Sequence, residues 1–343
     1  MNNIPWWLSF MIMMAKSQPV KASKPPVFAA LWRPIILMSL GLALLVSGCG
    51  GPMPPEDPFH LAEAKDALGR GNHWFQRGCP AEATRYFELG LEQARLSDDV
   101  PLIIKSLNAK GAAQISQNQL NQAALSLQQA LELSMAQDQN PEIDSVLGNL
   151  GLLALKANRP QDAKELWNRA IEEAQKKSLN PVLYHCNLAR LALASNDQAQ
   201  FQAQTELALA QAQNPNAPES AMADAFNLAA LKALAEGNDA QAETYLDQAL
   251  ALDRKNENQI GIAQDLETLA GLQTKTDRPL LAAASLDRAF YLWTALNDKK
   301  AQARVLAALE SLNKSTGHPK TIQPYRDVRN KPSLFDPINR LCP

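Results

Sequence analysis

Four asparagines recur at nearly constant intervals along the chain and are its most regular candidates for binding chemistry. Asn108, Asn149, Asn187 and Asn227 are separated by 41, 38 and 40 residues. A carboxamide carries both a donor and an acceptor, which matches the N–H and C=O of one peptide unit. Such a set suits capture of a peptide backbone and leaves the choice of side chains to neighbours such as Arg190. The alternative interpretation is that the four asparagines are solvated positions on amphipathic helices.

Catalytic and metal-binding patterns are missing from the sequence. It contains no glycine-rich phosphate loop and no G-x-S-x-G, H-E-x-x-H or C-x-x-C motif. The four histidines, His60, His73, His185 and His318, lie far apart without the spacing of metal ligands. We therefore expect a protein that is not an enzyme and that takes no cofactor, metal or small-molecule substrate.

The elements that must position the asparagines are helices, because a second pattern repeats with the same period. A small residue, a large apolar residue four positions later and a small residue three positions further place their side chains on one helix face. Small residues let a neighbouring helix approach closely, and the large side chain fills the gap. The pattern occurs six times, with first alanines 40, 40, 40, 39 and 40 residues apart: Ala83/Phe87/Gly90, Ala123/Leu127/Ala130, Ala163/Trp167/Ala170, Ala203/Leu207/Ala210, Ala242/Leu246/Ala249 and Ala282/Leu286/Ala289.

The residues around this pattern divide each unit into two helices. Proline stands three residues before the first alanine in three units, where the first turn of a helix tolerates it, at Pro80, Pro160 and Pro279. A small residue stands about twelve positions before the first alanine in five units, at Gly71, Gly111, Gly151, Ala230 and Ala270. The fourth unit departs, since Ala189 precedes Ala203 by fourteen residues. We therefore expect a longer turn in that unit.

These features resemble the tetratricopeptide repeat (TPR), a helix–turn–helix unit that usually spans about 34 residues. The resemblance covers roughly residues 60–300, and the longer unit is similar to the kinesin-light-chain-like branch of the family. It implies an all-α, right-handed superhelical solenoid of about six TPR-like helical hairpins plus a C-terminal capping helix. In that family the first helices line a concave groove, where asparagines bind the backbone of an extended peptide. The resemblance therefore favours a peptide-binding role for Asn108, Asn149, Asn187, Asn227 and Arg190.

The N-terminal residues read as a targeting segment. The first 48 residues contain four basic and no acidic side chains, and an uncharged run from 35 to 48 follows Pro34. This run is shorter than a membrane span and suits the apolar region of a signal peptide. The sequence Leu45-Val46-Ser47-Gly48-Cys49 resembles the lipobox of bacterial lipoproteins. That resemblance implies cleavage before Cys49 and its lipidation, with palmitate among the acyl chains that such proteins carry.

The location of the exported domain follows from the flanking residues. Basic residues precede the apolar run, so the positive-inside tendency places the remainder outside the cytoplasm. Gly50 stands where Asp favours retention in the inner membrane of lipoproteins. We therefore expect a lipid-anchored protein of the cell envelope, at the outer membrane and facing the periplasm.

The predicted organisation has five parts. Residues 1–48 form a signal peptide that is removed, and residues 49–58 form the lipidated cysteine and a flexible tether. A capping helix at 301–313 and a proline-containing tail at 314–343 follow the repeats. The six repeats occupy 59–300, at about 59–98, 101–138, 141–178, 181–214, 218–254 and 258–297.

Two functional hypotheses remain open at this point. The formal net charge of −2 disfavours nucleic acid, which requires a basic face. The first hypothesis is a membrane-anchored adaptor that binds a protein or peptide partner in the concave groove, in envelope, pilus or secretion assembly. The second is a self-assembling or autoinhibited lipoprotein whose C-terminal tail occupies the groove. Pairing of Cys79 with Cys342, if it occurs, pins that tail at the first repeat, whereas Cys186 reads as a buried thiol.

Overall fold

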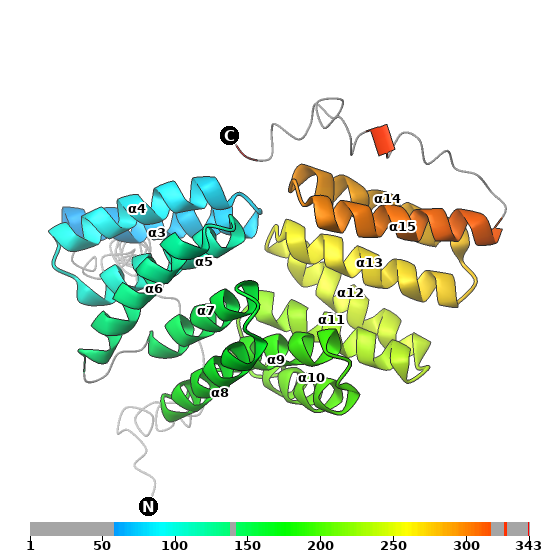
Figure 1. Ribbon diagram of the computed structural model, residues 1–343, viewed down its shortest axis with the longest axis horizontal. Helices are drawn as coiled ribbons and strands as arrows, with labels where there is room; N and C mark the ends of the chain where they lie inside the picture. Colours follow the sequence, from blue (N-terminus) through cyan, green and yellow to red (C-terminus); the bar gives the residue numbers. More distant parts are fainter. Residues whose placement is uncertain (1–57, 138–141, 317–325, 328–341, 343) are drawn as a thin grey trace, which may run out of the picture. The chain divides into compact units, whose positions relative to one another are not determined.

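The computed structural model describes residues 58–137, 142–316, 326–327 and 342, and the regular structure within them is entirely helical (Figure 1). Cys49 and the rest of the predicted targeting segment lie outside these residues. The helices of the described part are α3 (Phe59–Gln76), α4 (Pro80–Leu96), α5 (Val100–Ser116), α6 (Leu120–Met135), α7 (Ile143–Lys156), α8 (Pro160–Lys176), α9 (Val182–Ala194), α10 (Gln198–Ala212), α11 (Glu219–Ala235), α12 (Asp239–Lys255), α13 (Gln259–Lys275), α14 (Pro279–Ala295) and α15 (Lys299–Thr316).

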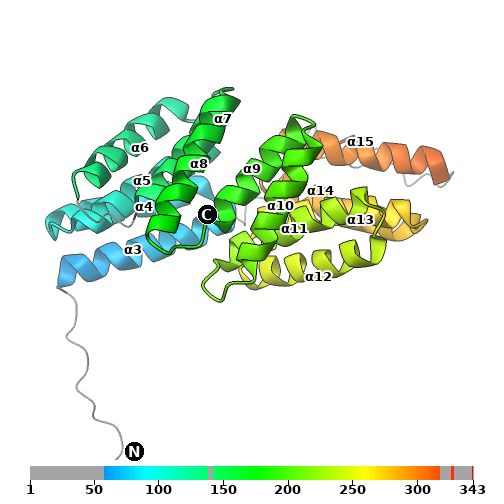
Figure 2. The same ribbon diagram turned by 90° about the horizontal axis from the view of Figure 1, so that it is seen from below.

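Twelve of these helices form six hairpins, and α15 follows as a thirteenth helix. The two helices of every hairpin are joined by three residues, from Arg77–Cys79 in the first to residues 276–278 in the sixth. The middle residue of each turn has a positive φ, which ends the first helix with a left-handed residue: Gly78, Asn118, Asn158, Asn196, Gly237 and Asp277. Figures 1 and 2 show successive hairpins side by side, so the predicted solenoid of hairpins is confirmed.

The small–large–small pattern forms the contacts between helices in five hairpins. The first alanine of each of these five patterns is 0% exposed. In the first three hairpins the large residue lies under a glycine of the first helix, so that a methyl group at Gly71, Gly111 or Gly151 collides with Phe87, Leu127 or Trp167 respectively. The missing side chain is therefore what lets the two helices close over the large residue.

In the fourth hairpin the sequence alignment is wrong by two residues. Leu207 is 45% exposed, and Ala203 and Ala210 are exposed as well. The buried face of α10 contains Phe201, Thr205 and Ala208 instead. The expected longer turn is also wrong, because residues 195–197 form the same three-residue turn as elsewhere and Asp197 caps α10 by accepting from the N–H of Gln200.

The C-terminal part of the described chain closes the stack. Helix α15 buries Ala301, Val305, Leu306, Leu309 and Leu312, which join the apolar cluster of α13 and α14. Further on, Arg326 forms an ion pair with Glu310 of α15. None of the helices in the described ranges combines the length and the hydrophobicity that crossing a bilayer requires.

Candidate peptide-binding groove

A hollow of about 660 Å³ lies along the first helices of the first three hairpins. Its apolar wall includes Leu68 and Phe75 of α3, Leu102 of α5 and Leu183 of α9. Its polar wall is contributed by α3, α5 and α7 and the residue before α7: Lys65, Asn72, Lys105, Asn108, Glu142, Ser145 and Asn149. The hollow therefore presents hydrogen-bonding groups opposite apolar side chains, as ligand sites in proteins do.

Two of the predicted asparagines meet in this hollow and are linked to each other. Asn149 donates from Nδ2 to Oδ1 of Asn108 at 2.8 Å, and Asn108 donates from Nδ2 to the hydroxyl of Ser145 at 2.8 Å. Each carboxamide uses one of its two N–H groups in these bonds. The second N–H of each amide and Oδ1 of Asn149 are therefore left for a ligand.

The other predicted binding residues lie elsewhere along the solenoid. Asn227 of α11 donates to Oδ1 of Asp265 at 2.7 Å and to Thr268 at 3.3 Å. Arg190 of α9 makes two hydrogen bonds to the carboxylate of Asp224, at 3.2 and 2.5 Å. Asn187 is 8% exposed, and its carboxamide has no hydrogen-bond partner among the described residues. The structure thus brings Asn108 and Asn149 together and places Asn227 and Arg190 in inter-repeat contacts of the later hairpins.

Three polar residues of the hollow were missed by reasoning from sequence. Asn72 of α3 lies outside the forty-residue spacing of the other asparagines, so the sequence gives no signal for it. Lys65 and Lys105 do carry a signal, because they stand 40 residues apart in equivalent helices. Lys105 forms an ion pair with Glu142 at 3.5 Å across the hollow.

Two buried carboxyl groups lie close together in the later hairpins and were not predicted from sequence. Asp253 of α12 is 2% exposed and Asp265 of α13 is 1% exposed. Burial, together with the negative charge of Asp253, raises the pKa of Asp265 to about 8. Burial raises the pKa of Asp253 to about 6, against a hydrogen bond from Asn258 that lowers it. Oδ2 of Asp265 has no other partner, so Asp265 holds a proton at neutral pH and donates it to Asp253.

The remaining reactive side chains are buried and separate. Cys186 is a free thiol, 0% exposed, and burial raises its pKa. Burial also lowers the pKa of His185, which hydrogen-bonds to Gln204 at 2.8 Å. Within the part of the chain that the structure describes, no three His, Cys, Asp or Glu side chains converge in a way that holds a metal ion.

Comparisons with known proteins give a likeness of fold. No protein-family model matches the chain, and no curated protein matches it in sequence. Among solved structures, the Cut9–Hcn1 heterotetramer of APC/C matches with a TM-score of 0.52 and 14% identity, over 83% of this chain and 57% of that one. This chain thus spans somewhat more than half of that protein.

Two bacterial structures are also similar. PilF of Pseudomonas aeruginosa matches with 16% identity and a TM-score of 0.42, over 67% of this chain and 97% of that one. A tetratricopeptide repeat protein of Parabacteroides merdae matches with 14% identity and a TM-score of 0.38, over 79% and 100%. The hairpin geometry and the likeness to the Cut9–Hcn1 structure together show that this chain has a TPR-like fold, an all-α solenoid of helical hairpins.

Proposed function

We propose that this protein is a membrane-anchored adaptor of the cell envelope that binds an extended segment of a partner protein in the hollow of α3, α5 and α7. The observation that carries the proposal is the linked pair Asn108 and Asn149. Their inter-repeat bonds at 2.8 Å fix both carboxamides in place, and each still has an N–H to offer. Preorganised groups of this kind reduce the entropy that a flexible ligand loses on binding.

The walls of the hollow suit a peptide of a few residues. A volume of about 660 Å³ lies within the range of ligand sites in proteins. The carboxamides hydrogen-bond to the peptide backbone whatever its sequence, and Leu68, Phe75 and Leu183 receive apolar side chains. Selection by charge falls to Lys65 and Lys105, which flank the same hollow.

The anchoring part of the proposal depends on Cys49 and its lipobox. Lipidation there holds the solenoid at a membrane, since more than one acyl chain gives durable attachment. A disulfide between Cys79 and Cys342 agrees with an oxidising compartment outside the cytoplasm. We place the protein at the outer membrane, facing the periplasm, in envelope assembly that includes pilus or secretion machinery. We also assign its long repeats to the kinesin-light-chain-like branch.

Lipidation is tested separately from binding. The full-length protein is expressed in a bacterium fed with radiolabelled palmitate, beside the variants Cys49→Ser and Cys186→Ser. We expect label in the wild type and in Cys186→Ser but none in Cys49→Ser, which should keep its signal peptide. Equal labelling of all three proteins excludes the anchor at Cys49.

Peptide binding is tested on a partner identified by cross-linking in envelope membranes. Overlapping peptides of that partner are then titrated against the full-length wild type and Asn149→Ala, with Asn168→Ala, on the exposed face of α8, as the matched control. We expect Asn149→Ala to weaken binding about tenfold or more, because a polar group of the bound peptide is left unpaired. Equal affinity of the three proteins overturns the proposed site.

A further inference from the structure

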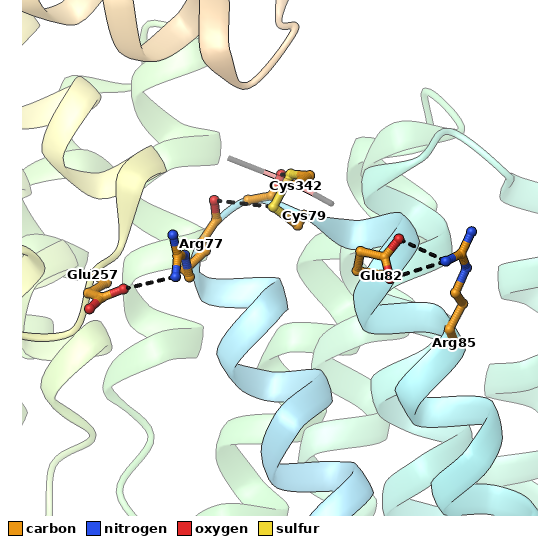
Figure 3. Close-up of a disulfide and its surroundings, with 7 residues drawn as sticks. Arg77, Cys79, Glu82, Arg85, Glu257 and Cys342 are labelled. Carbon is orange, nitrogen blue, oxygen red and sulfur yellow. Dashed lines mark hydrogen bonds and ion pairs between the residues drawn. A yellow bond between two sulfur atoms is a disulfide. The ribbon is translucent and has the colours of Figure 1, made fainter. Parts of the chain in front are cut away.

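The turn of the first hairpin contacts the fifth and sixth hairpins, far along the chain. Nη1 of Arg77 lies 3.6 Å from Oε2 of Glu257, in the turn between α12 and α13 (Figure 3). Gly78 has a φ of +76°, and a methyl group there collides with Leu296 and lies 4.0 Å from Cγ1 of Ile260. In most repeat arrays each repeat contacts only its neighbours. Here the first repeat also contacts the last ones.

The C-terminal end of the chain is fastened at the same turn. Cys79, the residue after Gly78, forms a disulfide with Cys342 across 263 residues, with 5.5 Å between their Cα atoms (Figure 3). Cys342 follows α15 in the chain, and α15 packs on the sixth hairpin. The disulfide therefore joins the first hairpin covalently to the end of the chain that caps the last hairpin.

The contacts beside the disulfide are weak by themselves. The side chain of Arg77 is 30% exposed and that of Glu257 is 55% exposed, and ion pairs this accessible contribute little because water screens them. Nε of Arg77 is buried without a hydrogen-bond partner among the described residues, which costs part of that contribution. The apolar contact at Gly78 involves few side chains. The disulfide is therefore the strongest restraint that holds the two ends of the solenoid together.

We propose that the Cys79–Cys342 disulfide is a redox-sensitive latch: the oxidised form holds the first hairpin against the fifth and sixth, and the reduced form lets the ends of the solenoid separate. This inference concerns the conformation of the repeats and stands apart from the identity of any bound partner.

The opening step is ordinary thiol–disulfide exchange with a dithiol reductant. One thiolate of the reductant attacks Sγ of Cys342, which is more accessible than that of Cys79 (1% exposed). The S–S bond breaks, and its electron pair stays on Cys79, which then takes a proton. Cys79 is the N-cap of α4, where the positive end of the helix dipole favours the departing thiolate. The second thiol of the reductant resolves the mixed disulfide, which leaves two protein thiols and an oxidised reductant.

Hydrogen exchange on the full-length protein in detergent tests the latch. The oxidised wild type is compared with the same protein reduced by dithiothreitol and with Cys342→Ser, and Cys186→Ser is the control with a buried thiol removed. We expect backbone amides of residues 77–79, 257–262 and 296–298 to exchange at least tenfold faster in the reduced and Cys342→Ser proteins. Their helix content by circular dichroism should remain that of the oxidised wild type, which Cys186→Ser should match in both measurements.

Two results overturn the proposal. Equal exchange at these turns in oxidised and reduced protein means that the ends stay together without the disulfide. Loss of helix content on reduction means that the disulfide is part of the fold and not a latch. The variant Glu257→Lys distinguishes the contributions: we expect it to exchange like wild type when oxidised and faster than wild type when reduced. Faster exchange already in its oxidised form contradicts the latch as well.

Discussion

Tyr184 of α9 donates a hydrogen bond of 2.7 Å from its hydroxyl to Oδ2 of Asp144 in α7. The tyrosine ring lies against the backbone of Gly148, where a methyl group would collide with it. Both polar side chains are buried, and burial together with the charge of Asp144 raises the pKa of Tyr184 well above its ordinary value. This pair joins the third hairpin to the fourth, which is the hairpin whose sequence departs most from the repeat pattern.

Replacement of Tyr184 by phenylalanine should destabilise the protein by about 1–3 kcal/mol, because it leaves a buried carboxylate without its donor. Oδ1 of Asp144 already has no partner among the described residues, so the carboxylate has no alternative bond in reserve. Urea unfolding followed by circular dichroism measures the effect. Tyr291→Phe, on an exposed tyrosine of α14, is the matched control and should shift the midpoint little. A Tyr184→Phe midpoint equal to that of wild type contradicts the importance of the pair.

Stability should fall as the pH rises from about 5 to about 8. The pKa of Asp265 is raised to about 8 in the folded protein, against about 3.9 in an unfolded chain, so the folded state binds the extra proton between these values. Stability from this group is therefore complete at low pH and is lost as the pH approaches 8, at up to about 1.4 kcal/mol per pH unit. The raised pKa of Asp253, about 6, acts in the same direction at lower pH.

The variant Asp265→Asn should remove most of this pH dependence. Its amide can accept from Asn227 and donate to Asp253 at every pH, as the protonated acid does. Urea midpoints at pH 5, 6.5 and 8.5 give the slope for wild type, Asp265→Asn and the exposed control Asp247→Asn. We expect the control to keep the wild-type slope. A wild type that is more stable at pH 8.5 than at pH 5 would show that Asp265 is ionised when folded.

Alanine at Gly151 should destabilise the protein, and alanine at Gly271 should not. A methyl group at Gly151 collides with the indole of Trp167, which is 0% exposed and donates to the backbone oxygen of Gly148 at 3.0 Å. Such overpacking costs about 1–3 kcal/mol. Gly271 of α13 has open space around it, so Gly271→Ala should gain up to about 1 kcal/mol from helix propensity. Thermal melts of the two variants should therefore move in opposite directions, and a shift of both in one direction refutes the packing argument.

Valine at Thr205 should stabilise the fourth hairpin by about 1 kcal/mol. The threonine is 1% exposed, and its hydroxyl has no hydrogen-bond partner among the described residues. Valine keeps the shape and removes the cost of a buried unpaired hydroxyl. Thr244→Val is the control, because that exposed hydroxyl already donates to the backbone oxygen of Ala240 at 3.0 Å. A lower melting temperature for Thr205→Val would show that the hydroxyl makes a bond inside the protein.

The hairpins could be predicted from the sequence because their packing depends on small and large residues at fixed spacing. The fourth hairpin shows where this reasoning fails. Phe201 occupies the place of the usual first alanine and Thr205 that of the large residue, so the alignment slid to the alanine at 203. The interval of 38 residues between Asn149 and Asn187 already recorded the two-residue shift, since Ala189 precedes Phe201 by the usual twelve residues.

The candidate site could be predicted only in part, because its hydrogen bonds cross between repeats. Spacing in sequence placed Asn108 and Asn149 on equivalent helices, and the structure links them through Ser145. The same spacing gave no sign that Asn227 is bound to Asp265. A partner on a neighbouring helix depends on the rotation of both helices, which one helical pattern does not specify.

A stack of repeats ordinarily frays from its ends, because a terminal repeat has a neighbour on one side only. The link between Cys79 and Cys342 leaves this stack without a free end, since the 263 residues between them form one covalent loop. Restricting the denatured chain in such a loop is worth on the order of 5 kcal/mol in the chain-entropy picture. The oxidised protein should therefore unfold in a more concerted way than an open array of the same six hairpins, with partly frayed forms held to low populations.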